Sequence, residues 1–111
     1  MTYQAIAEMI EGIGLPSVYY QFKEGEVPSL PYVIFYYPSR TDFLADDLNF
    51  QKITKLVIEL YASDKDFGAE TLVENMLEAN NLVYTKAETY LDDEKMYMTL
   101  YQTEVLINEQ S

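Results

Sequence analysis

Two long segments of this chain, residues 48–62 and 95–107, alternate in side-chain character, and this alternation constrains the fold more than any other feature. A period of two residues is that of a β-strand with one covered face. In 95–107, one face would carry Tyr97, Thr99, Tyr101, Thr103, Val105 and Ile107, and the other would carry Met96, Met98, Leu100 and Gln102. In 48–62 only the second half is apolar on one face. We predict that this half packs against a helix and that the first half projects from the domain.

Two helices are predicted over residues 3–13 and 67–80, because apolar side chains recur there with helical spacing. Thr2 is a candidate N-cap for the first helix, and Asp64 and Asp66 are candidates for the second. The stripes consist of Ile6, Met9, Ile10 and Ile13 in the first helix, and of Ala69, Leu72, Val73, Met76 and Leu77 in the second. Glu70, Glu74 and Glu78 recur every four residues, and we expect them to form one solvated acidic ridge.

Shorter β-prone runs complete the pattern at residues 18–22, 32–37 and 82–90. The acidic segment 39–47 is predicted to be a loop. A length of 111 residues corresponds to one domain, 1–111. The predicted order is α-β-β-β-α-β-β, and the predicted fold class is α+β: a single mostly antiparallel β-sheet with two helices packed on one face. The link through the second helix would be a crossover, and the other strand links would be hairpins.

The composition excludes most catalytic chemistry. The chain has no Cys and no His, so it cannot build a Ser-His-Asp or Cys-His triad or a thiolate zinc site. It has 7 Lys and Arg residues and 19 Asp and Glu residues. The resulting net charge of −12 argues against binding to a phosphate backbone. We expect no enzymatic activity, no cofactor and no sequence-specific nucleic-acid partner. No apolar run reaches the roughly 20 residues that span a bilayer, and no signal peptide is visible, so we expect no membrane partner and a cytoplasm-like compartment.

Two acidic clusters, Asp46-Asp47 and Asp92-Asp93-Glu94, are the only candidates for a divalent-cation site. Calcium and magnesium prefer oxygen ligands, but an EF-hand loop also needs a glycine and ligands at alternate residues. Neither cluster has that spacing. Solvated turns are the preferred interpretation, and we predict no metal site.

The 11 Tyr residues are the most unusual part of the composition. Tyrosine offers a large, fairly rigid contact area with a polar tip, and it is enriched at protein interfaces. Packing within the sheet is an equally good interpretation. The candidates for contacts between subunits are Tyr19, Tyr32, Tyr36, Tyr37, Tyr97 and Tyr101. Phe43 and Leu44, an apolar pair inside the acidic loop, are candidates either for docking to a partner or for folding back onto the domain.

Several segments together resemble a known family: 15–38, TDFLADDLNFQ at 41–51, LVIELYASDKDFGAETLVENMLEANNL at 56–82, and YLDDEKMYMTLYQTEVL at 90–106. They are similar to small head–tail joining, or tail-completion, proteins of phages and prophages of Gram-positive bacteria with long non-contractile tails. The resemblance covers nearly the whole chain. It implies a structural virion protein with a fold like that of tail terminators.

The resemblance also implies partners. Such proteins form a ring, commonly six-fold, between the head connector or stopper protein and the tail-tube or terminator protein, and they wait in the host cytoplasm before assembly as monomers or weak oligomers. Acidic residues, either Glu70, Glu74 and Glu78 or 92–94, would then flank the DNA channel, although the charge can equally serve solubility. The alternatives are a tail terminator that caps the tube and a related subunit of a phage-like secretion machine.

Overall fold

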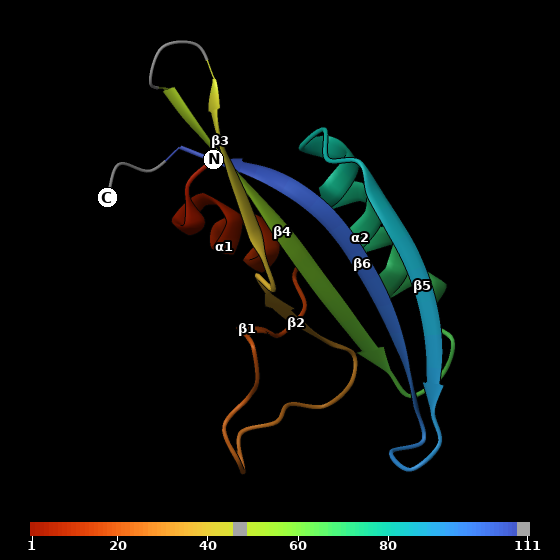
Figure 1. Cartoon of the computed structure of the whole chain (residues 1–111). Helices are drawn as coiled ribbons and strands as arrows, with labels where there is room; N and C mark the ends of the chain where they lie inside the picture. The colour runs from red at the N-terminus through yellow and green to blue at the C-terminus, as the bar shows by residue number, and fades with distance from the viewer. Residues whose placement is uncertain (46–48, 109–111) are drawn as a thin grey trace.

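The computed structural model describes residues 1–45 and 49–108 and has an α+β fold (Figure 1). Two helices accompany a six-stranded mixed sheet that is mostly antiparallel. The elements, in chain order, are α1 (Tyr3–Glu11), β1 (Ser17–Tyr19), β2 (Tyr32–Tyr36), β3 (Arg40–Ala45), β4 (Asn49–Ala62), α2 (Phe67–Ala79), β5 (Tyr84–Leu91) and β6 (Met96–Ile107). The predicted fold class is therefore confirmed, and the predicted order lacks one strand, β3.

The sheet has the order β1-β2-β4-β6-β5, and β3 pairs with the first part of β4. β4 and β6 form the longest ladder, from Lys52 opposite Ile107 to Ala62 opposite Tyr97. β5 also pairs with β6, so the crossover through α2 joins two parallel strands that have β6 between them. The expected hairpin between the first two strands is wrong, because β1 and β2 are parallel. Their connection, residues 20–31, has the length that a parallel link requires.

The predicted loop at 39–47 is wrong for residues 40–45, which form β3 along the same edge of β4 as β2. Tyr36 lies opposite Val57 and Arg40 lies opposite Thr54, so the β2–β3 side contains one residue more than β4. This is a β-bulge beside Pro38, which has no N–H to donate to the ladder. Beyond it, the N–H of Lys55 donates to the carbonyl of Ser39 at 2.9 Å.

Both helices pack on the same face of the sheet, as predicted (Figure 1). The hydroxyl of Thr2 accepts from the N–H of Ala5 at 3.0 Å and caps α1, while Asp66 caps α2 by accepting from Ala69 N–H at 2.9 Å. The shared core consists of Ile6, Ile10, Ile13, Val33, Phe35, Leu56, Ile58, Leu60, Ala69, Val73, Leu77, Tyr101, Val105 and Ile107. These sheet residues occupy the predicted faces of β4 and β6.

A two-stranded arm extends from this body (Figure 1). We define the arm as residues 40–45 and 49–55, that is, β3 with the part of β4 beside it. The ladder with β6 ends at Lys52, so the outer part of the arm has only two strands. The predicted projection of the first half of β4 is confirmed, and the molecule is elongated, with extents of 51 × 27 × 24 Å.

Candidate assembly surface

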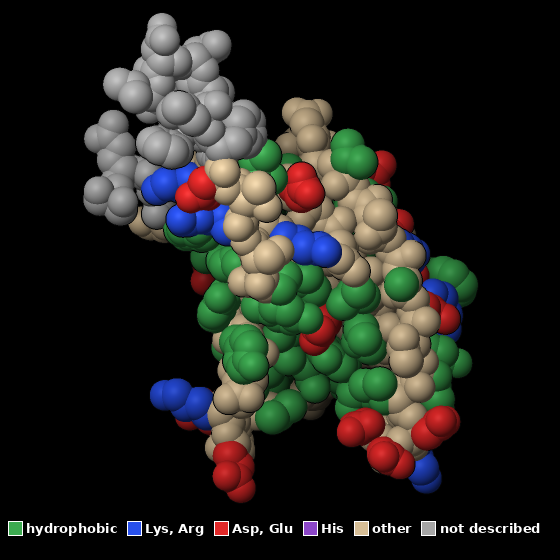
Figure 2. Space-filling model, viewed as in Figure 1, with side chains coloured by type: hydrophobic (Ala, Val, Ile, Leu, Met, Phe, Trp, Pro, Cys, Tyr) green, Lys and Arg blue, Asp and Glu red, His purple; other side chains and the backbone are tan. Residues whose placement is uncertain are grey.

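The second face of the sheet is covered by neither helix, and Figure 2 shows hydrophobic side chains gathered over its middle. The ladder register places on this face the side chains of Ile34, Tyr36, Val57, Tyr61, Met98 and Leu100. We call these six residues, together with Glu59, the open face. Val57 is only 4% exposed and the others are half-buried, because larger neighbours on adjacent strands surround them.

A carboxylate flanked by two tyrosines lies at the centre of the open face. The hydroxyl of Tyr36 donates to Glu59 Oε2 at 2.7 Å, and the hydroxyl of Tyr61 donates to Glu59 Oε1 at 2.6 Å. Across the two ladders, Glu59 lies opposite Ile34 on one side and Leu100 on the other. The charge of Glu59 is therefore set among apolar side chains and held by two neutral donors.

Further rings fix the two tyrosines in place. The ring of Tyr20 packs edge-on against Tyr36, with centroids 6.1 Å apart, and the ring of Tyr32 lies 5.3 Å from that of Tyr61. Burial, followed by the hydrogen bond to Glu59, raises the pKa of Tyr36 to about 12. The same causes raise the pKa of Tyr61. Both hydroxyls therefore stay protonated and continue to donate at neutral pH.

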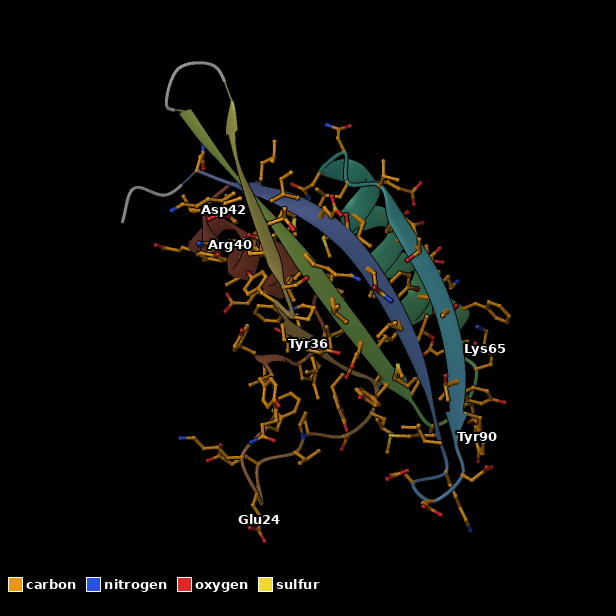
Figure 3. The ribbon with its side chains drawn as sticks, in the orientation of Figure 1. Glu24, Tyr36, Arg40, Asp42, Lys65 and Tyr90 are labelled. Carbon is orange, nitrogen blue, oxygen red and sulfur yellow. The ribbon has the colours of Figure 1, made fainter. Side chains whose placement is uncertain are left out.

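The structure places the predicted interface tyrosines in different environments. Tyr36 belongs to the open face and lies at the end of β2, beside β4 (Figure 3). Tyr37 is half-buried and packs edge-on against Tyr3 of α1, with centroids 5.0 Å apart. Tyr97 is half-buried against Tyr90. Tyr101 is 1% exposed beneath α2, so it is not available to a second subunit, and we assign it to the core.

Phe43 and Leu44 lie in β3, opposite Gln51 and Phe50 of β4. Their side chains lie outside what the structure describes, and so do residues 46 and 47 of the acidic segment. Their predicted docking role therefore stays a prediction. What the structure adds is that the backbone at Phe43 and Leu44 is a strand of the arm and not a loop.

The predicted solvated ridge on α2 is wrong for Glu70 and Glu74, which contact cations, whereas Glu78 is exposed as predicted. Glu70 is 3% exposed, and its two carboxylate oxygens lie 2.7 Å from Lys65 Nζ and 2.7 Å from Lys86 Nζ. Glu74 lies 2.8 Å from Lys86 Nζ and accepts from the hydroxyl of Tyr101 at 2.7 Å. Burial opposes ionisation of both carboxyls, but their lysine and hydroxyl partners outweigh it and lower both pKa values. Glu70 cannot line a channel, so we withdraw that role for the ridge.

The remaining acidic residues form no converging site in the described ranges. No group of three or more His, Cys, Asp or Glu side chains is positioned there to hold a metal ion. An open groove of about 570 Å³ at the start of β5 has a single carboxylate, Glu104, in its lining. Within 1–45 and 49–108, no helix is long and apolar enough to cross a membrane.

Sequence reasoning missed Glu59 and Tyr61, although part of the signal was present. The two residues are separated by two positions in a predicted strand, so they had to share a face. Tyr36 joins them only because Ile34 lies opposite Glu59, and that register is a property of the folded sheet. The signal in the sequence was Glu59 itself, a carboxylate on the apolar half of a predicted strand.

Comparison with known proteins identifies no relative of this chain: no protein-family model matches it, and neither does any curated protein. The function of the open face therefore has to be argued from its own geometry and chemistry.

Proposed function

We propose that this chain is a structural virion protein that joins the phage head connector to the tail, working as a subunit of a ring. The observation that carries the proposal is the open face: in the described part of the chain, neither helix covers the mostly apolar middle of this side of the six-stranded sheet. Surfaces of this kind mark contacts with other proteins. The resemblance of segments 15–38, 41–51, 56–82 and 90–106 to tail-completion proteins supports the same role.

The arm supports an assembly role by a separate argument. Beyond the end of the β6 ladder, β3 and β4 pair only with each other, and two strands alone are marginally stable in water. A neighbouring subunit that packs against the arm would supply the missing contacts. A ring provides such a neighbour for every copy. Head-to-tail contacts form a closed ring when a whole number of equal rotations between subunits makes one full turn.

In this proposal the chain performs no catalysis and needs no cofactor. Its partners are other copies of itself in a ring, commonly six-fold in the family it resembles, a connector or stopper protein on the head side, and a tail-tube or terminator protein on the tail side. Its place is the head–tail interface of the virion, after a period in the host cytoplasm. The acidic turn 92–94 remains a candidate for flanking the DNA channel, where like charge would keep DNA from adhering.

Deletion of the gene from the phage or prophage that encodes it tests the proposal. Electron micrographs of the lysate should show filled heads and separate tails of normal length, and supplying the protein from a plasmid should restore joined particles. Tails of uncontrolled length would indicate the terminator role instead. Infectious particles in normal number without the gene would refute a role in the virion.

A further inference from the structure

The centre of the open face restricts which surface can cover it. Glu59 has two oxygens with about four acceptor sites, and the two tyrosine hydroxyls occupy two of them. In the described ranges 1–45 and 49–108, no Lys or Arg forms an ion pair with Glu59. A partner that covers the apolar side chains also removes water from this carboxylate. An ionised carboxylate buried without a cation costs several kcal/mol, so a fitting partner has to bring a cation.

The cations of the chain are distributed unevenly. Lys65 and Lys86 are occupied by Glu70 and Glu74 on the helix side of the sheet. Lys23 directly precedes Glu24, and Lys95 directly follows Glu94. The other three cations, Arg40, Lys52 and Lys55, all belong to the arm. Residues 40–55 contain three cations and three carboxylates, so the net charge of −12 comes entirely from the rest of the chain.

From this we propose that the Tyr36–Glu59–Tyr61 cluster is the acceptor for a cationic side chain from the arm of a second copy of this chain. Contact between two bodies would bring strong like charge together, whereas segment 40–55, whose charges sum to zero, can approach a body without that repulsion. The two fixed tyrosines add to the attraction, because aromatic faces bind ammonium and guanidinium groups. The inference rests on the proposed function in so far as it specifies the subunit contact of the ring.

Arg40 and Lys52 are the candidate donors. They lie on one side of the arm, where Arg40 is opposite Thr54 and Lys52 is opposite Asp42. Arg40 forms a surface ion pair with Asp42 at 2.9 Å, and Figure 3 shows both residues on the arm. Both side chains of this bidentate pair are partly exposed, so water screens it and Arg40 can exchange Asp42 for a desolvated carboxylate. Because donor and acceptor are different surfaces, the contact repeats from copy to copy.

Sedimentation velocity over a wide concentration range at low salt tests the pairing. Glu59→Gln keeps the size of the side chain and a hydrogen-bonding group between the tyrosines, but it removes the charge. We expect it to weaken self-association at least about tenfold. Glu24→Gln is the matched control, because it makes the same change of net charge in the exposed loop between β1 and β2. It should associate like the original chain.

The arm variant Arg40→Gln with Lys52→Gln tests the other partner without touching the open face, with Lys23→Gln and Lys95→Gln as its charge-matched control. We expect a loss comparable to that of Glu59→Gln, and no further loss when the two are combined. Circular dichroism confirms that each variant is folded. A chain that stays monomeric at every concentration, or equal association of Glu59→Gln and Glu24→Gln, overturns the inference. Neither result bears on the unjoined heads and tails that test the proposed function.

Discussion

Lys86 holds two carboxylates of α2 against the sheet, and its replacement by Met is the sharpest test of how this helix is anchored. Its Nζ lies 2.7 Å from Glu70 and 2.8 Å from Glu74. Met keeps most of the apolar stem, so the change removes chiefly the charge. Glu70, whose side chain is only 4% exposed, would keep Lys65 alone, and Glu74 would keep the hydroxyl of Tyr101.

The expected loss is about 2 kcal/mol in the free energy of unfolding. Breaking one partner of a fully buried pair costs roughly 3–5 kcal/mol. The Lys86 side chain is 37% exposed, so water screens the pair and replaces part of it, and the estimate has to be reduced accordingly. For a chain of this size, about 2 kcal/mol corresponds to a fall in Tm of about 10 °C.

Thermal unfolding followed by far-ultraviolet circular dichroism at pH 7 measures this loss. Lys23→Met is the control, because it makes the same change of charge on an exposed loop and should alter stability by less than about 0.5 kcal/mol. If Lys86→Met is no less stable than Lys23→Met, the ion pairs do not anchor α2 and the reasoning is refuted.

The pH dependence provides a second check on the same network. The pKa values of Glu70 and Glu74 are lowered in the folded state from an ordinary value of 4.5. Their contribution to stability is therefore fully present above pH 4.5 and is lost as the pH falls through the folded-state values. The difference between the original chain and Lys86→Met should be largest at neutral pH and should shrink below pH 4.5. A difference that is the same at pH 3 and pH 7 would contradict this.

Three further measurements test other parts of the structure. Asp66→Ala should cost about 1 kcal/mol by chemical denaturation because it removes the α2 cap, while Asp64→Ala should be near neutral. Leu77→Ala, at a fully buried core position, should cost about 3 kcal/mol in the same assay. The pKa of Tyr36, about 12, means that stability should decline as the pH rises above 10, and Glu59→Gln should lower that pKa, as read from the ¹³Cζ shift of a labelled tyrosine. An unchanged shift titration in Glu59→Gln would show that Tyr36 does not donate to Glu59.

The spacing of apolar residues along the sequence predicted those parts of the fold that depend on residues close together in the chain. The alternation in β4 and β6 identified which side chains face the helices, since a strand turns each successive side chain to the opposite face. The helical stripes did the same for Ile6, Ile10 and Val73, all of which are fully buried. The ends of the predicted strands and helices differed by at most three residues from those of the structure, and several coincided.

The errors came from pairings that depend on distant residues. Pro38 and the acidic residues after it are typical of a loop. Residues 40–45 nevertheless form a strand, because they pair with the edge of β4. A helical projection showed that Glu70 and Glu74 lie off the apolar stripe, yet it cannot show that Lys86 of β5 lies opposite them. Glu59 was missed for the same reason, because its contact with Tyr36 depends on the register between β2 and β4.

Electron cryomicroscopy of phage particles induced from the strain that carries this gene tests the central claim most directly. We predict a ring of copies between the head connector and the tail tube, in which the open face of each subunit is covered by the arm of its neighbour. A ring in which the open face remains exposed to solvent, or a particle without the protein, would contradict the account.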